Sequence, residues 1–144
     1  MKIFFDTSML VAALVQAHPA HQQAISRLQR INAGQDTGCT AAHSIAELYA
    51  VLTAYPIRPR IAPALARQLI RQSVFTQFEI IALDSTDYAA VIEQLAESGI
   101  SGGATYDALI LFAAHKANVD QILTLNEGDF RRLRPDLSHR ITTP

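Results

Sequence analysis

Three carboxylates stand out in this sequence because each is the only charged residue in a long stretch. The residues, and the stretches in which no other Asp, Glu, Lys or Arg occurs, are Asp6 in 3–26, Glu47 in 37–57 and Asp107 in 98–115. A carboxylate buried without compensation costs several kcal/mol, and no basic residue nearby in sequence compensates any of them. We therefore expect the three side chains to meet around a divalent cation, which neutralises their mutual repulsion and offsets their desolvation.

The positions of these carboxylates relative to the predicted strands agree with a shared site. Asp6 follows an apolar run at 3–5 that is typical of a strand buried on both faces of a parallel sheet. Glu47 lies in the helix after a second strand, and Asp107 lies in the first turn of the helix that precedes a fourth. Because ligands of open α/β sheets bind beyond the carboxyl ends of the strands, these residues should converge there.

The segment after the fourth predicted strand carries further oxygen ligands. Asn126, Glu127 and Asp129 follow Thr124, and the three-residue spacing places Asn126 and Asp129 on one face if the turn is helical. We expect Asp129 to support metal binding and Asn126 to contribute a neutral carbonyl oxygen or an orienting hydrogen bond. The alternative is that Asp129 only caps the short turn before Phe130.

Each of the three isolated carboxylates also has an ordinary structural explanation. Asp6 could act only as a helix cap, and Asp107 only as a favourable charge at a helix N-terminus. Glu47 lies in the middle of its helix, where the alternative is an ion pair with a remote arginine. Asp84 is the contrast, because it follows a strand but is succeeded by Ser85, Thr86 and Asp87, which indicate an ordinary helix start.

Other residue types give weaker signals. The five histidines are scattered without the spacing of a zinc-binding helix, and the glycine-rich loop at 99–103 lacks the lysine of a phosphate-binding loop. No histidine, lysine or cysteine is positioned as a nucleophile, so we expect no covalent enzyme intermediate. Thr7, Ser8 or Thr124 could orient a carboxylate through a hydrogen bond.

Strands alternate with helices along the chain. The predicted strands cover 3–5, 37–40, 78–83 and 122–124, with a short edge strand at Ile141. The predicted helices are a short one capped by Thr7 or Ser8, and longer ones at 18–31, 44–55, 62–72, 86–97 and 105–117. This alternation predicts a single α/β domain over 1–144, built around a mostly parallel sheet.

The bulk composition restricts the classes of function. With 12 basic and 13 acidic residues, the chain offers no broad basic surface, so any nucleic-acid site must be local. Cys39 is the only cysteine, which excludes an internal disulfide and favours a reducing, cytoplasmic location. Asp6 interrupts an N-terminal stretch that otherwise resembles a secretory signal, and no run approaches the length of a membrane span. We expect no membrane association.

Four short motifs occur in order along nearly the whole chain. They are Ile3-Phe4-Phe5-Asp6-Thr7-Ser8, Ser44-Ile45-Ala46-Glu47-Leu48, Gly103-Ala104-Thr105-Tyr106-Asp107-Ala108 and Thr124-Leu125-Asn126-Glu127-Gly128-Asp129-Phe130. Each motif is weak alone, but their ordered combination is specific. On these motifs the chain resembles the PIN-domain ribonucleases, and in particular the VapC-like toxins of type II toxin-antitoxin systems.

The resemblance implies a three-layer α/β/α PIN-like fold, Mg²⁺ or Mn²⁺ at the acidic cluster, endonucleolytic cleavage of RNA, a cognate antitoxin protein and self-association as a homodimer. It aligns Asp6, Glu47 and Asp107 with the family's first three acidic positions. Asn126 falls where many members have a fourth Asp, which leaves Asp129 as the substitute. Hard carboxylate oxygens suit a hard cation, which lowers the pKa of a bound water for attack on phosphorus.

Two other classes of protein compete with this interpretation. A phosphatase of the haloacid-dehalogenase type also places an Asp after its first strand, but it needs a second Asp two residues later, where this chain has Ser8. A non-catalytic PIN-like module that binds RNA or protein is the other alternative. Asn126 is the only sequence feature that favours it.

Overall fold

The protein is built around a sheet of five strands, all parallel, in the spatial order β3-β2-β1-β4-β5. The strands are β1 (Lys2–Phe5), β2 (Thr37–Ala41), β3 (Phe78–Ile81), β4 (Gln121–Leu123) and β5 (Ile141–Thr142). A computed structural model describes all 144 residues. The predicted parallel sheet and the short edge strand at Ile141 are confirmed.

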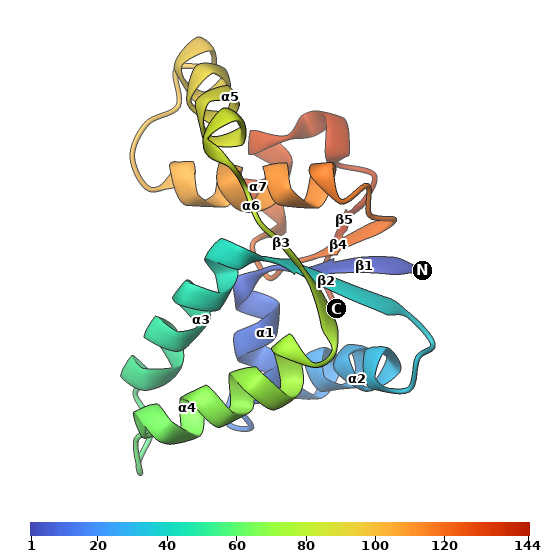
Figure 1. Cartoon of the computed structure of the whole chain (residues 1–144), viewed down its shortest axis with the longest axis vertical. Coiled ribbons are helices and arrows are strands. Elements are labelled where there is room, and N and C mark those ends of the chain that lie inside the picture. Colours follow the sequence, from blue (N-terminus) through green and yellow to red (C-terminus); the bar gives the residue numbers. More distant parts are fainter.

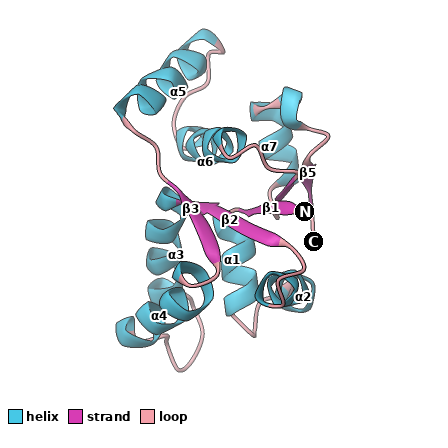
Figure 2. Cartoon of the chain, turned by 45° about the vertical axis from the view of Figure 1, so that its right-hand side comes forward, coloured by secondary structure: helices cyan, strands magenta, loops and turns pink.

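Seven α-helices cover the two faces of the sheet. They are α1 (Thr7–Leu14), α2 (His21–Asn32), α3 (Ala42–Ala54), α4 (Pro63–Ile70), α5 (Ser85–Glu97), α6 (Ala104–Lys116) and α7 (Glu127–Leu133). Helices α1 to α4 lie on one side of the sheet and α5 to α7 on the other (Figures 1 and 2). The chain therefore has the predicted three-layer α/β/α architecture.

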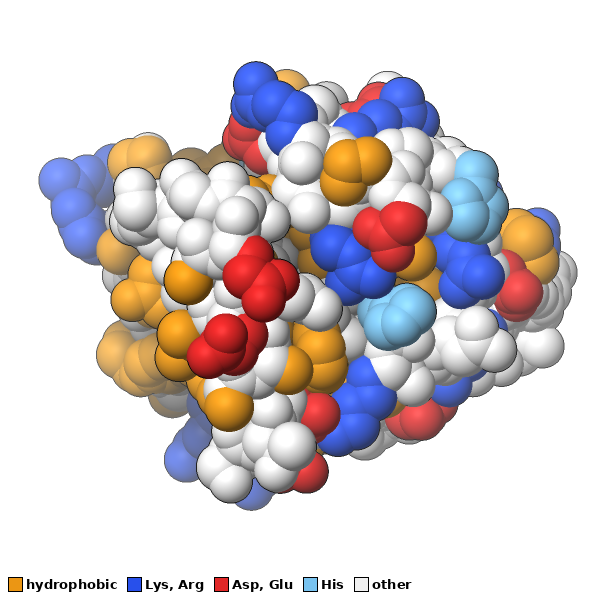
Figure 3. Space-filling view, turned by 90° about the horizontal axis from the view of Figure 1, so that it is seen from above, with side chains coloured by type: hydrophobic (Ala, Val, Ile, Leu, Met, Phe, Trp, Pro, Cys, Tyr) orange, Lys and Arg blue, Asp and Glu red, His pale blue; other side chains and the backbone are white.

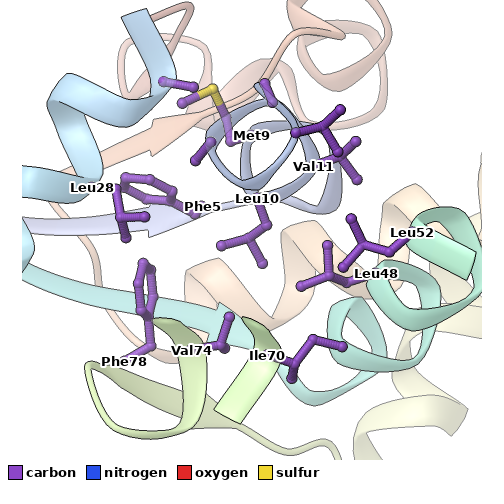
Figure 4. Close-up of a cluster of buried hydrophobic side chains, with 14 of the residues drawn as sticks. Phe5, Met9, Leu10, Val11, Leu28, Leu48, Leu52, Ile70, Val74 and Phe78 are labelled. Atoms are coloured by element: carbon purple, nitrogen blue, oxygen red, sulfur yellow. The ribbon is translucent and has the colours of Figure 1, made fainter. Parts of the chain in front are cut away.

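Strand β1 shows why its apolar run predicts a strand that is buried on both faces. Ile3 and Phe5 point into the core under α1 to α4, whereas Phe4 points into the core under α6 and α7. Phe5 contacts the edge of Phe78 with ring centroids 5.2 Å apart, and Met9 lies in the same cluster (Figure 4). Both layers are thus anchored on the strand that ends at Asp6.

Helix α6 is apolar on nearly all sides because it lies between the sheet and α5 (Figure 1). Ile110 and Leu111 pack into the cluster that contains Phe4, whereas Leu109 packs against Val91 and Leu95 of α5. A helix covered on two sides needs no polar face. This packing explains why Asp107 is the only charged residue near the start of that helix.

Several element boundaries differ from the predictions by a few residues, among them the end of β3 at Ile81 and not at residue 83. Helix α2 begins at His21 and not at His18, because residues 18–20 form a turn in which the Ala20 amide donates to Nδ1 of His18 at 3.0 Å. The helix predicted to end at residue 72 ends at Ile70 and continues as a π-helical turn, Arg71–Phe75. The first helix is not capped by Thr7 or Ser8, since Asp6 occupies the cap position.

The structure also contains elements that the sequence patterns did not indicate. Helix α7 and the 3₁₀ turn Pro135–Leu137 are both shorter than the segments in which hydrophobic periodicity is informative. None of the helices has the length and apolar character needed to cross a membrane.

Candidate active site

Asp6 is the buried anchor of the candidate site, with only 2% of its surface exposed. Its Oδ1 accepts hydrogen bonds from the Ser8 hydroxyl at 2.6 Å and from the Met9 amide at 3.0 Å. Its Oδ2 accepts a hydrogen bond from the Thr124 hydroxyl at 2.7 Å. Asp6 therefore does cap α1, but the cap occupies only one of its two oxygens, and the other is held from β4.

A small hydrogen-bond network joins the carboxyl ends of β1 and β4. The Ser8 hydroxyl accepts from the Leu125 amide at 3.0 Å, and the Thr124 hydroxyl accepts from the Asn126 amide at 2.9 Å. Both hydroxyls also donate to Asp6. The prediction that Ser8 or Thr124 orients a carboxylate is confirmed for both residues.

Glu47 lies on α3, with about a third of its side chain exposed. Its Oε1 lies 3.3 Å from the Thr7 hydroxyl, which donates to it, and 3.3 Å from Nε2 of His43 one turn earlier on α3. No arginine pairs with Glu47, so the alternative of an ion pair with a remote arginine is wrong. The carboxylate keeps an oxygen available at the site.

Asp107 lies in the first turn of α6, and its carboxylate forms no hydrogen bond or ion pair within the chain. Burial raises its pKa, and the negative charges of Glu47 and Asp129 raise it further. Asp107 is therefore close to both of these carboxylates and shares their repulsion. Its charge at the helix N-terminus is favourable, but that role alone does not explain three neighbouring acids.

The pKa of Asp6 is also raised, by burial and in part by the charge of Asp107. Burial raises it from the usual 3.8 to about 6, against the opposing effect of the hydrogen bonds from Ser8, Met9 and Thr124, and Asp107 adds repulsion. The site thus holds more negative charge than its own donors stabilise. A nearby positive charge would relieve this repulsion.

Asp129 and Asn126 are the two candidates for the fourth acidic position. Asp129 on α7 lines an open hollow of about 430 Å³ together with Asp107, while its exposed carboxylate pairs with Arg132. Asn126 precedes α7, but its side chain makes no capping hydrogen bond. Glu127 is paired with Arg131 at 2.6 Å. The structure therefore brings Asp129, and not Glu127, next to Asp107.

The carboxylates are neighbours in pairs around Asp107, and no three His, Cys, Asp or Glu side chains are close enough, as placed, to hold one metal ion. The donor set nevertheless fits a hard divalent cation, because it consists of carboxylate oxygens and includes an uncompensated charge at Asp107. Glu47 and Asp129 are partly exposed. Their side chains can therefore change rotamer without disturbing the core.

Two residues at the site were missed from the sequence, His43 and Tyr106. His43 contacts Glu47, and its ring stacks on that of Tyr106 with centroids 5.5 Å apart and an angle of 4° between the planes. The four-residue spacing from His43 to Glu47 on one helix was an available signal. The approach of Tyr106 to His43 had none, because the two residues are distant in sequence.

The face of the molecule around α5 to α7 carries charges of both signs. On the face formed around α5 to α7, basic and acidic side chains are interspersed and form no single broad basic patch (Figure 3). Several of these charges belong to ion pairs, such as Lys116 with Asp87 and Arg134 with Asp136.

The sequence of the chain matches a family model and is similar to a known ribonuclease. A family model described as the PIN domain matches residues 3–134. The chain is 38% identical over 112 residues to Ribonuclease VapC40 of Mycobacterium tuberculosis, and the match covers 78% of each chain.

Two solved structures share the fold. One is VapBC2 from Rickettsia felis bound to a DNA fragment from their promoter, with a TM-score of 0.68 and 18% identity over 100% of this chain and 99% of that one. The other is VapC20 of Mycobacterium tuberculosis, a Sarcin-Ricin loop cleaving toxin, with a TM-score of 0.64 and 16% identity over 83% and 86% of the two chains.

Proposed function

Because the chain belongs to the PIN-domain family, we propose that it is an endoribonuclease that acts as the toxin of a toxin-antitoxin pair. The observation that carries this proposal is the position of Asp107, a half-buried carboxylate without a cation partner, among Asp6, Glu47 and Asp129. The cluster lies beyond the carboxyl ends of β1 and β4, which is where substrates of open α/β sheets bind.

We further propose that Asp6, Glu47, Asp107 and Asp129 hold Mg²⁺ or Mn²⁺. When bound, such a cation polarises a phosphate oxygen and lowers the pKa of a coordinated water. Ser8 and Thr124 position Asp6, and Thr7 positions Glu47. Asn126 offers a neutral amide near this edge, which holds a cation more weakly than a carboxylate does.

The chain's other reactive side chains favour direct hydrolysis over a covalent intermediate. The thiol of Cys39 is buried, and burial raises its pKa to about 12, so it is not a nucleophile at neutral pH. The two lysines, Lys2 and Lys116, are engaged with Glu79 and Asp87. The carboxylates are thus the reactive groups of the site.

The test is RNA cleavage by the purified chain with Mg²⁺ or Mn²⁺, repeated with EDTA. Asp6→Asn should abolish cleavage, whereas the matched control Asp84→Asn should keep it. Asp84 also caps a helix that follows a strand, with its Oδ1 accepting from the Asp87 amide at 2.9 Å, but it lies outside the cluster. Equal cleavage by wild type and Asp6→Asn would overturn the assignment. Absence of cleavage in the wild type would favour the non-catalytic module.

An apolar groove beside the cluster supports an antitoxin partner. The groove has a volume of about 1110 Å³ and is bordered by α3, α4, the π-helical turn and β3. The large apolar side chains of Tyr49 and Phe75 line it and are exposed. Arg67 and Arg71 also line it and form no ion pair within the chain. A partner segment with apolar and acidic side chains suits this surface.

The groove and the acidic cluster share α3. Ala42 and Ala46 line the groove, and Glu47 follows directly in the sequence. A segment bound in the groove therefore passes close to the cluster, where an arginine from the partner could neutralise the carboxylates and inhibit the enzyme. Self-association of the chain as a homodimer stays a prediction from the family resemblance.

The partner is tested by expressing the chain from its native operon, together with any small open reading frame that lies immediately upstream of its gene. We expect a stable complex that does not cleave RNA, and we expect a Tyr49→Ala/Phe75→Ala double variant to lose the partner. The control is Tyr88→Ala on α5, which removes an equally exposed tyrosine outside the groove. Operon expression that yields only free, fully active enzyme would contradict the proposal.

A further inference from the structure

The stacked rings of Tyr106 and His43 connect the two helical layers next to Glu47 of the acidic cluster. Tyr106 belongs to α6 and His43 to α3, which lie on opposite faces of the sheet (Figure 1). Their rings are nearly parallel, with an angle of 4° and a centroid separation of 5.5 Å. His43 contacts Glu47, so the Tyr106 ring that stacks on His43 is one residue removed from this acid.

Packing of the protein core does not account for the position of Tyr106. The side chain is 54% exposed and belongs to none of the three hydrophobic clusters. One face of its ring rests on His43, and more than half of the residue's surface is exposed to solvent. The imidazole of His43 is only partly exposed and contacts Glu47, so it holds the tyrosine ring in a defined orientation.

The charge of the site makes such a ring useful for binding RNA. The cluster is acidic, and Arg132 beside it is already paired with Asp129. Electrostatic attraction for phosphates, which dominates most nucleic-acid binding, is therefore weak at this position. Stacking of a base on an aromatic ring needs no positive charge and tolerates any base, because every base has a π face.

We propose that the Tyr106–His43 stack is a binding platform for one unpaired RNA base next to the phosphate that the acidic cluster cleaves. This inference rests on the proposed ribonuclease function and identifies the element that selects single-stranded RNA at the cleavage point. The base stacks on the open face of Tyr106, and His43 supports the ring from behind. A base inside a duplex cannot reach this ring, so cleavage is directed to loops and unpaired ends.

The experiment compares Tyr106→Ala and Tyr106→Phe with the control Tyr88→Ala. The bond cleaved by wild type in a single-stranded RNA is mapped first, and the same RNA is then made with the base removed from the nucleotide on either side of that bond. Binding is measured by fluorescence anisotropy with Ca²⁺ in place of Mg²⁺, and cleavage is measured separately as KM and kcat.

Tyr106→Ala should weaken binding of the intact RNA by about 5-fold or more and raise KM more than it lowers kcat. Tyr106→Phe and Tyr88→Ala should both bind as wild type does. For wild type, removal of one of the two bases should weaken RNA binding by a similar factor. Tyr106→Ala should bind the intact and the abasic RNA equally, because the substitution and the base removal eliminate the same contact. Equal binding of the intact RNA by wild type and Tyr106→Ala would overturn the platform.

The outcome separates this inference from the proposed function. If wild type cleaves no RNA, the ribonuclease assignment fails, and the platform is judged by anisotropy with a pool of labelled single-stranded RNA. A loss of binding in Tyr106→Ala then supports the platform, and unchanged binding refutes it. If wild type cleaves RNA and Tyr106→Ala has the same KM and the same cleaved bonds, the ribonuclease stands and the platform is wrong.

Discussion

Replacing Asp6 by Asn tests separately what the Asp6 charge does to the stability of the fold and what it contributes to RNA cleavage. The folded protein without metal carries Asp6 in a buried position that disfavours ionisation. Asn has the same shape, and its side-chain oxygen can still accept hydrogen bonds from Ser8 and the Met9 amide. Only the bond from Thr124 must be rearranged, because Asn places an amide donor where Asp6 has Oδ2.

The magnitude follows from the pKa of Asp6. A rise from 3.8 to about 6 means that ionising this group is less favourable in the folded than in the unfolded chain by about 3 kcal/mol, at about 1.4 kcal/mol per pKa unit. Rearranging the Thr124 hydrogen bond costs about 1 kcal/mol. Without metal and at neutral pH, Asp6→Asn should therefore be more stable than wild type by about 2 kcal/mol.

The pH dependence has a defined sign. Because the folded pKa is raised, the wild type carries no penalty below the unfolded pKa of 3.8, and it acquires the full penalty as the pH rises through about 6. The stability advantage of Asp6→Asn should thus grow by about 1 kcal/mol between about pH 5 and about pH 7.5.

The assay is urea unfolding in EDTA at these two pH values. Circular dichroism is the appropriate signal, because the chain has no tryptophan. Asp84→Asn, which alters an exposed cap, should show a smaller change. The reasoning is refuted if Asp6→Asn is less stable than wild type at neutral pH, or if its advantage is the same at both values.

Asp107→Asn should abolish RNA cleavage while its free energy of unfolding in EDTA stays equal or rises, because a repelled carboxylate is neutralised; full cleavage activity in this variant would remove Asp107 from the site. Thr124→Val should lower stability by about 1–3 kcal/mol by leaving buried polar groups of Asp6 and Asn126 unpaired. It should also raise the pKa of Asp6, so protons compete with the cation up to a higher pH, which a metal titration of cleavage at two pH values detects. Asn126→Asp should tighten metal binding and lower the metal concentration needed for half-maximal cleavage, whereas Asp129→Asn should weaken metal binding and raise that concentration. An unchanged metal dependence of cleavage in Asp129→Asn would mean that this residue lies outside the metal site.

The sequence was sufficient for the class of fold, and it singled out carboxylates that the structure brings near one another. The isolation of Asp6, Glu47 and Asp107 among uncharged residues is a local property, but the structure buries only Asp6 fully and leaves Glu47 and Asp107 partly exposed. The apolar run at β1 was sufficient to predict a strand covered on both faces. Local patterns report such features because burial and backbone preference act residue by residue.

Contacts between distant segments were decided only by the tertiary structure. The order of the strands places β4 beside β1, and this order lets Thr124 reach Asp6 across 118 positions of the chain. It likewise brings Asp129 near Asp107, and the docking of α3 and α6 around the sheet brings Tyr106 onto His43. No local periodicity encodes which strands become neighbours, because strand order is selected by how all the apolar faces pack together.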